Sequence, residues 1–196
     1  MVYDECIAPE WCDRPSLKVA PDLIGCILIR QLPSGPLIRA TIVETEAYAP
    51  DDPACHAYRG MSKRNASMFG PPGHSYVYLI YGMYYCLNVV TEPSGIGSAV
   101  LIRALELATI PPNIDPKHLK KPDRIAAGPG KLCRALDIDR TLDGSPYHPS
   151  SGLWLAHRSH LIDPADIVQT TRVGITQAAD RPWRWYLKNS PAVSKP

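Results

Sequence analysis

Two glutamates lie close together in an apolar segment, where a charged side chain needs a partner. Residues 43–48 read Val-Glu-Thr-Glu-Ala-Tyr. On a strand Glu44, Glu46 and Tyr48 point the same way, and Ile42 shares that side. At least one carboxylate therefore approaches a partly buried region, where it requires an ionic partner or has a raised pKa.

Arg103 has the same requirement, because on a strand it shares a face with Leu101 and Leu105. A structural explanation is an ion pair inside the sheet between this arginine and one of the glutamates. A functional explanation is a glutamate that holds and deprotonates a water molecule, with arginine as its orienting neighbour. The pattern by itself leaves both explanations open.

Five of the ten tyrosines fall within residues 75–85. With the two-residue period of a strand, Tyr76 and Tyr78 share one face and Tyr81 lies on the other. This density is typical of an aromatic sheet surface, and it also suits a stacking surface for nucleobases, since any base can pack on a ring. His56 and Asn88 are isolated polar residues that indicate no function alone.

Basic residues are clustered, although the 196-residue chain has a net charge of only +2. Residues 53–91 hold three Lys or Arg and no acid, residues 117–131 hold five and one acid, and residues 181–196 hold four and none. Such segments can meet phosphates, but solvated lysines give the same pattern. The small total excludes a disordered acidic protein and a histone-like polybasic chain.

The composition is that of one folded domain, with 45% hydrophobic and 20% charged residues. We expect this domain to span residues 1–196, with its ordered core at about residues 12–189. The apolar run at residues 23–29 is too short for a membrane helix, and no signal peptide is visible. We therefore expect an intracellular protein whose six cysteines are small core residues.

The elements that must position these residues are mostly strands in succession. The turn-forming residues 33–36 and Gly82-Met83 separate strand pairs, and a helical segment at residues 131–136 follows Gly-Pro-Gly at 128–130. This pattern predicts an α+β domain with a curved, mainly antiparallel sheet, flanking helices and a protruding hairpin. Strands are expected at residues 23–30, 37–48, 75–81, 84–91, 98–106, 152–157, 167–174 and 183–187.

An ordered set of motifs resembles the alkyladenine (3-methyladenine) DNA glycosylase family, over about residues 23–191. The set consists of Val-Glu-Thr-Glu-Ala-Tyr (43–48), His56, Arg64-Asn65, Met68-Phe69, Tyr-Val-Tyr-Leu-Ile-Tyr-Gly-Met-Tyr (76–84), Asn88, Leu-Ile-Arg-Ala-Leu-Glu (101–106) and Gly-Pro-Gly-Lys-Leu-Cys (128–133). The resemblance implies extrusion of a damaged purine from duplex DNA and hydrolysis of its N-glycosidic bond. The candidate bases are 3-methyladenine, 7-methylguanine, ethenoadenine and hypoxanthine.

The resemblance also implies the roles of the charged residues. Glu46 matches the residue that activates the attacking water, and Arg103 matches the one that helps to position it. Glu44 is the competing candidate, but Glu46 directly precedes the matching Ala-Tyr pair. No lysine nucleophile is implied, so we expect a monofunctional enzyme, DNA-3-methyladenine glycosylase II, that leaves an abasic site. No metal and no organic cofactor is implied.

Base recognition falls to the aromatic residues in the same comparison. Tyr48 matches one side of the slot for the flipped base, and His56 and Tyr78 match the opposite wall. The backbone amide of His56 corresponds to a contact with the base edge. Tyr81 matches the side chain that fills the hole in the duplex, and Asn88 matches the residue that disfavours the amino group of guanine.

The resemblance leads us to expect a monomeric repair enzyme that acts on double-stranded DNA in the cytoplasm or nucleoid, or in the nucleus of a eukaryote. Two other functions are the alternatives. A non-catalytic module for damaged or distorted nucleic acid would keep the tyrosines but would not need Glu46. A retaining sugar hydrolase would place its two carboxylates on opposite sides of the scissile bond. Glu44 and Glu46 are two apart on a strand and point the same way, which argues against that chemistry.

Overall fold

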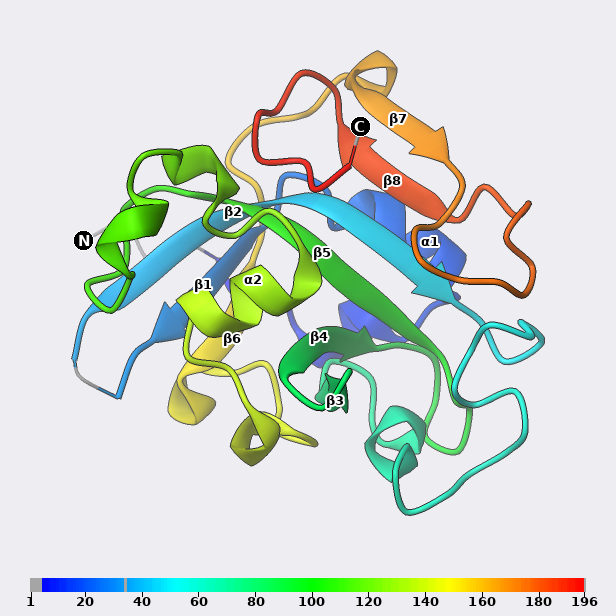
Figure 1. Ribbon diagram of the computed structural model, residues 1–196. Helices are drawn as coiled ribbons and strands as arrows, with labels where there is room; N and C mark the ends of the chain where they lie inside the picture. Colours follow the sequence, from blue (N-terminus) through cyan, green and yellow to red (C-terminus); the bar gives the residue numbers. More distant parts are fainter. Residues whose placement is uncertain (1–4, 34, 196) are drawn as a thin grey trace.

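An open sheet of eight antiparallel strands occupies the centre of this computed structural model, which describes residues 5–33 and 35–195 (Figure 1). Six strands follow the order β3-β4-β5-β2-β1-β6, and β8 pairs with both β2 and β7. The strands are β1 (Ile27–Gln31), β2 (Leu37–Tyr48), β3 (Ser75–Ile80), β4 (Tyr84–Val90), β5 (Ala99–Leu107), β6 (Leu153–Ala156), β7 (Ile167–Thr170) and β8 (Arg184–Leu187). The predicted mainly antiparallel sheet is confirmed.

Two short α-helices flank the sheet, α1 (Ser16–Asp22) behind it and α2 (Pro129–Ala135) in front of it (Figure 1). The predicted α+β class is therefore confirmed. Short 3-10 helices lie outside the strands: η1 (Pro9–Cys12) precedes α1, and the connections between strands contain η2 (Ala66–Phe69), η3 (Pro116–His118), η4 (Pro122–Arg124), η5 (Arg140–Leu142), η6 (Pro149–Ser151) and η7 (Pro164–Asp166).

Helix α2 packs on the sheet through its apolar side. Leu132 and Leu136 are fully buried in the main hydrophobic cluster together with Leu87 of β4. Pro129 starts the helix at a position whose missing N–H costs no helical hydrogen bond. Burial of large aliphatic side chains of this kind stabilises a fold by about 1.5–3 kcal/mol each, so packing rather than length maintains this short helix.

The prediction of a strand from residue 23 is wrong, because β1 begins at Ile27. Leu23 and Ile24 are buried at the end of α1, and Gly25 then turns the chain with a φ of 83°. A buried apolar run fits a helix end and a strand equally well. Helix α1 itself was not predicted, since Pro21 lies inside it.

The prediction of a strand through residue 174 is also wrong, because β7 ends at Thr170. Residues 171–174 leave the sheet because Arg172 turns inward to a buried ion pair with Asp52. The next amide, that of Val173, donates a hydrogen bond to the Glu46 carboxylate at 2.7 Å. The segment therefore contributes to a polar cluster rather than to the sheet.

The six cysteines are all free, and five of them are buried as predicted. Cys6 is exposed, which corrects the prediction for that residue. It lies at the sheet edge, where it forms an isolated bridge with Ala156 of β6. Within the described part of the chain, no helix has the length and apolar character needed to cross a bilayer.

Candidate active site

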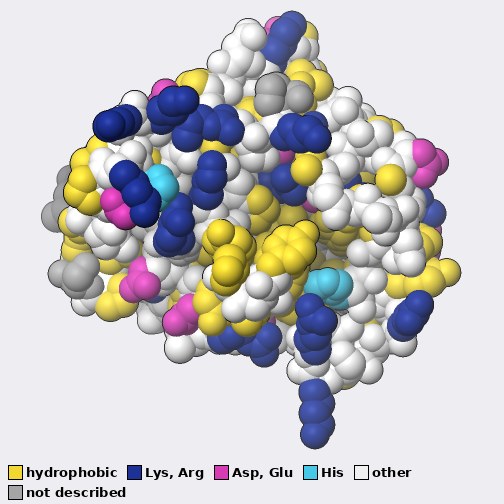
Figure 2. All heavy atoms as spheres, in the orientation of Figure 1, with side chains coloured by type: hydrophobic (Ala, Val, Ile, Leu, Met, Phe, Trp, Pro, Cys, Tyr) yellow, Lys and Arg dark blue, Asp and Glu magenta, His cyan; other side chains and the backbone are white. Residues whose placement is uncertain are grey.

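A cavity of about 670 Å³ opens between the β3–β4 hairpin, the loop after β2, and α2. Figure 2 shows it as a hollow with hydrophobic side chains inside and basic side chains around its rim. Six of the seven residues singled out from the sequence line it: Tyr48, His56, Tyr78, Tyr81, Asn88 and Arg103. Topology brings them together, since β4, β5 and β2 are neighbours in the sheet.

Aromatic rings form one wall of the cavity. The rings of His56 and Tyr78 meet edge to face with centroids 4.6 Å apart, and Tyr76 and Tyr78 lie 5.3 Å apart. The Nδ1 atom of His56 is 2.8 Å from the Tyr76 hydroxyl. The side-chain amide of Asn65 donates to the His56 carbonyl oxygen at 2.8 Å. The wall is therefore held from both sides before any ligand binds.

Burial controls the protonation of this wall. It raises the pKa of the Tyr76 and Tyr78 hydroxyls well above the ordinary value, so both stay protonated near neutral pH. Partial burial and, secondarily, the nearby Arg64 guanidinium lower the pKa of His56. The wall therefore presents uncharged rings near neutral pH.

Glu46 lies directly behind the cavity and is fully buried. Its Oε2 atom accepts a hydrogen bond from the Tyr48 hydroxyl at 2.9 Å. Its Oε1 atom accepts from the Val173 amide at 2.7 Å and lies 3.2 Å from Nη1 of Arg103. Glu46 is not itself among the lining residues, but Tyr48, Val173 and Arg103 all are.

Glu44 is also fully buried and binds the other side of Arg103. Its Oε1 atom accepts from Nε of Arg103 at 2.8 Å and from Nη1 of Arg184 at 2.9 Å. The amide and the hydroxyl of Ser194 donate to the same carboxylate. Despite burial, the positive Arg103 and the Ser194 hydrogen bonds lower the pKa of Glu44, so it is ionised at neutral pH.

On each of the strands β2 and β5, one residue lies on the opposite face from the one predicted. Ile42 and Ala47 are an odd number of residues apart, yet both belong to the main core cluster. An irregular register between Ile42 and Thr45 breaks the alternation. Ile42 therefore does not share a side with the glutamates, and Leu105, which also lies in that cluster, does not share one with Arg103.

Tyr81 also departs from the predicted alternation. The strand ends at Ile80, and Tyr81 occupies the turn with a φ of 53°. It lines the same cavity as Tyr78 instead of turning to the opposite face. The residue is 78% exposed, which makes it one of the most exposed large hydrophobic residues described. It forms the rim of the cavity.

Comparison with known proteins decides the family. The model of the family described as "Methylpurine-DNA glycosylase (MPG)" matches residues 10–191. This chain belongs to the methylpurine-DNA glycosylase family. The resemblance noted from the motifs is therefore confirmed, and the chain is a hydrolase of N-glycosyl bonds that acts on DNA in the repair of alkylated bases.

Individual relatives of this glycosylase are similar along nearly their whole length. A protein of Trichodesmium erythraeum is 56% identical over all of both chains. A protein of a Synechococcus strain is 53% identical over 94% of this chain and 97% of its own. One of Methanocella arvoryzae is 50% identical over 95% and 94%. Each is named "Putative 3-methyladenine DNA glycosylase".

The structure of the glycosylase adds residues that the motifs did not identify. Asp52 and Arg172 form a fully buried ion pair behind Tyr48, and the Arg172 guanidinium lies 4.7 Å from the centre of that ring. Ser194 and Arg184 complete the cluster around Glu44. Their partners come from segments distant in the chain, so sequence spacing carries no signal for them. The absence of acids from residues 181–196 was interpreted as a phosphate-binding signal, but Arg184 in that segment instead pairs with the buried Glu44.

Among residues 5–33 and 35–195, no three His, Cys, Asp or Glu side chains are grouped so that they could hold a metal ion. The polar groups that face the cavity are instead suited to hydrogen bonding. Asn88, for example, donates from its side-chain amide to the Tyr76 carbonyl oxygen at 2.9 Å, which sets its orientation. The candidate site is therefore an aromatic slot with an ion-pair cluster behind it.

Proposed function

We propose that this chain is a monofunctional DNA glycosylase that extrudes an alkylated or deaminated purine from duplex DNA and hydrolyses its N-glycosidic bond. The candidate bases are 3-methyladenine, 7-methylguanine, ethenoadenine and hypoxanthine. One observation carries the proposal: the buried Glu46 carboxylate lies directly behind an aromatic cavity and 3.2 Å from Arg103, which lines that cavity. This arrangement suits a general base beside a base-stacking slot.

Glu46 has one acceptor position for which no partner is described among residues 5–33 and 35–195, and in this proposal a water molecule takes it. Each carboxylate oxygen has about two acceptor positions. The Val173 amide donates to Oε1, which also forms an ion pair with Arg103, whereas the Tyr48 hydroxyl is the one partner of Oε2 within the described residues. The remaining position on Oε2 accepts a hydrogen bond from the nucleophilic water. Burial raises the pKa of Tyr48, and the adjacent Glu46 raises it further, so its hydroxyl remains a donor near neutral pH.

The reaction is then a displacement at the sugar. The water oxygen forms a bond to C1′ while the bond from C1′ to the purine nitrogen breaks, and Glu46 receives the proton from the water. The electron pair of the broken bond leaves with the base. A cationic methylpurine leaves readily, whereas a neutral base such as hypoxanthine needs protonation or strong hydrogen bonding of the departing ring.

Tyr48 and the His56–Tyr78 wall hold the base in this proposal. An electron-poor methylated purine stacks well on electron-rich rings, by the same physics as a cation–π contact. Asn88 disfavours the amino group of normal guanine. The backbone amide of His56 is the contact for the base edge, and its loop is held by Asn65.

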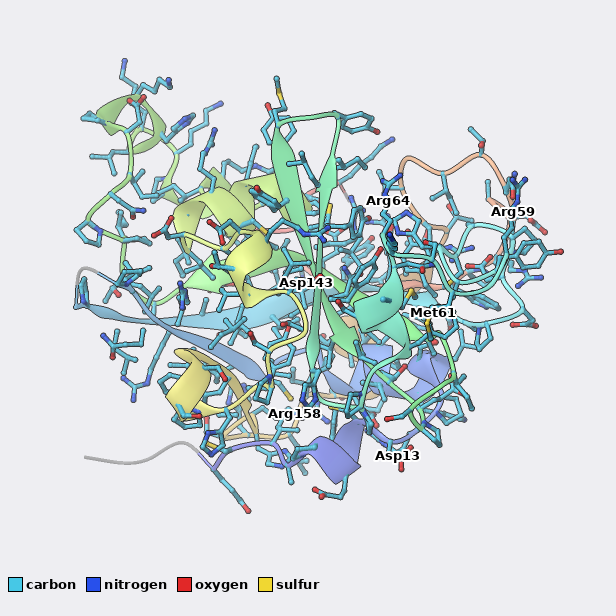
Figure 3. The ribbon with its side chains drawn as sticks, turned by 90° about the horizontal axis from the view of Figure 1, so that it is seen from below. Asp13, Arg59, Met61, Arg64, Asp143 and Arg158 are labelled. Carbon is cyan, nitrogen blue, oxygen red and sulfur yellow. The ribbon has the colours of Figure 1, made fainter. Side chains whose placement is uncertain are left out.

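The hairpin and the basic segments receive the duplex. Tyr81 stands at the exposed tip and fills the space left by the extruded nucleotide. Figure 3 shows Arg59 and Arg64 on the loop beside the hairpin, with α2 on the hairpin's other side. Lys131 and Arg134 of α2 line the cavity. Positive charge on both sides of Tyr81, which acts as a wedge in this proposal, suits contact with two stretches of phosphate backbone. We expect the enzyme to act as a monomer inside the cell.

Product analysis with labelled duplexes tests this function. Duplexes carrying each candidate base are incubated with excess enzyme, beside an undamaged duplex as control. We expect free base to appear together with an alkali-labile abasic site, and the strand to remain intact until alkali is added. Tight binding of damaged duplexes without release of any base would instead indicate a non-catalytic binding module.

A further inference from the structure

Arg103 is held by a separate partner at each of its three nitrogens. Its Nε donates to Glu44 at 2.8 Å, its Nη2 donates to the Ser194 hydroxyl at 3.3 Å, and its Nη1 lies 3.2 Å from Glu46. A guanidinium next to a single carboxylate prefers a two-point pair with both oxygens. Here Nη1 is the nitrogen of Arg103 that meets Glu46, while Nε and Nη2 donate to Glu44 and Ser194.

The partners that hold Arg103 away from Glu46 form a compact buried group. Glu44 is fully buried and accepts from Arg103, Arg184 and the amide and hydroxyl of Ser194. Glu46, two residues along the same strand, is the other acid nearby, so two glutamates balance two arginines. Glu44 takes no part in the hydrolysis described above, which leaves its burial at this position unexplained by that chemistry.

The segment that supplies Ser194 is itself fixed in place. Arg124 donates to the carbonyl oxygens of Pro191, Val193 and Ser194 at 2.6–3.0 Å. Ala192 and Val193 are buried in a small cluster with Val43 and Ala104, on the strands that carry Glu44 and Arg103. Residues 190–195 therefore lie as a strap across the glutamate–arginine cluster.

We propose that Glu44 and Ser194 are positioning residues, which hold Arg103 so that it binds only Oε1 of Glu46 and leaves Oε2 open to water. Without them the guanidinium swings into a two-point pair with Glu46 and occupies the position that the nucleophilic water needs. This proposal rests on the proposed function. Glu44 acts through Arg103 and touches neither substrate nor water.

Ser194→Ala with a matched control tests the proposal. Ser190 lies in the same strap and its hydroxyl also donates to a glutamate, Glu106, but that contact is exposed. For each variant we measure the maximal single-turnover rate of hypoxanthine excision at saturating enzyme, the affinity for an abasic duplex, and the thermal midpoint. A purely structural residue would change the midpoint but not the rate of the folded enzyme.

We expect Ser194→Ala to lower the maximal rate about tenfold, the scale of one charge-assisted hydrogen bond, with its affinity for DNA unchanged. Ser190→Ala should match the wild type in both. Glu44→Gln should lower the rate further than Ser194→Ala. A wild-type rate in Ser194→Ala, or an equal loss in both serine variants, would overturn the proposal. A wild type that releases no base would overturn the proposed function itself.

Discussion

His56 packs against two tyrosine rings and lines the cavity, and this environment disfavours its protonated form. Partial burial lowers its pKa, and the Arg64 guanidinium lowers it further. A neutral imidazole wall suits a cationic methylpurine, because a positively charged wall would repel such a base. Residue-scale electrostatics therefore match the charge of the proposed substrate.

The pKa of His56 should respond to its neighbour. We expect Arg64→Ala to raise it, because the repulsion between two positive groups is removed. Since the folded-state pKa lies below the unfolded one, the stabilising contribution of His56 is present above the unfolded pKa and is lost as pH falls through the folded one. NMR titration of the imidazole measures the shift. Lys63→Ala, an exposed neighbour absent from the causes of the shift, is the control, and an equal response in both variants would contradict the assignment.

The hairpin between β3 and β4 combines a strained turn with an exposed aromatic ring. Tyr81 and Gly82 have φ values of 53° and 68°, and the Met83 amide bonds to the Ile80 carbonyl oxygen. Two successive positive φ angles are typical of a type I′ turn, which favours Asn or Gly at both positions. A tyrosine in the left-handed region costs about 1–2 kcal/mol, so this side chain is retained at the expense of stability.

Tyr81→Gly should therefore separate stability from function. We expect the free energy of unfolding to stay constant or rise by up to about 1 kcal/mol, while excision from duplex DNA falls severalfold or more. Denaturant unfolding and single-turnover kinetics measure the two effects. Gly82→Ala is the control: it should lower the free energy of unfolding, because Gly82 has a positive φ, but it keeps the Tyr81 side chain. Undiminished excision by Tyr81→Gly would contradict the wedge.

The loop after β2 is held by the buried Asp52–Arg172 pair. Arg172 also donates to the Ala47 carbonyl oxygen at 3.0 Å and packs over the Tyr48 ring. It thereby joins the base slot to residues 171–174, whose Val173 amide binds Glu46. The Asp52–Arg172 ion pair therefore connects the wall of the cavity to the segment that binds the Glu46 carboxylate.

Asp52→Asn should destabilise the whole protein. Breaking a buried ion pair leaves an uncompensated charge and typically costs about 3–5 kcal/mol. The neighbouring Asp51 is exposed, so Asp51→Asn is a matched control that should change stability by less than about 0.5 kcal/mol. Urea unfolding measures both variants. A loss of stability below about 1 kcal/mol in Asp52→Asn would show that Arg172 finds other partners.

Strand bounds that follow from a long apolar pattern were predictable from the sequence, whereas bounds that depend on contacts with distant residues were not. The bounds of β2 agree with the prediction, because its apolar pattern is long and a proline-containing turn precedes it. The start of β1 and the end of β7 were predicted wrongly. Gly25 turns the chain before β1, and Arg172 leaves the sheet after β7 to pair with Asp52. The charged site residues were identifiable as buried charges, but the partners of Glu44 were not, because they lie up to 150 residues away in sequence.

The charge of the whole molecule is nearly balanced, at +2, yet its basic side chains gather around the cavity (Figure 2). Lys131 and Arg134 line the cavity and are exposed, and no acidic partner of either is described within residues 5–33 and 35–195. Lys117, by contrast, pairs with Asp115 at 2.8 Å. We therefore propose that the face that bears Tyr81 is also the face that meets phosphates.

The salt dependence of DNA binding tests whether Lys131 and Arg134 contact phosphates. The logarithm of the binding constant falls with the logarithm of salt by about 0.9 per neutralised phosphate. We expect Lys131→Ala and Arg134→Ala each to reduce the slope by up to that amount. Lys18→Ala, exposed on α1 behind the sheet, should leave it unchanged. Affinity titrations of an undamaged duplex at several salt concentrations give the slopes. Equal slopes for the three variants would show that DNA binds at another surface.

The most direct test of the account is the single-turnover rate of Glu46→Gln. The amide keeps the shape of the side chain but cannot accept a proton from water. On a hypoxanthine duplex at saturating enzyme, we expect a loss of at least about 10²-fold, with affinity for the damaged duplex retained. Excision by Glu46→Gln at the wild-type rate would contradict Glu46 as the general base, and with it the mechanism built on this cluster.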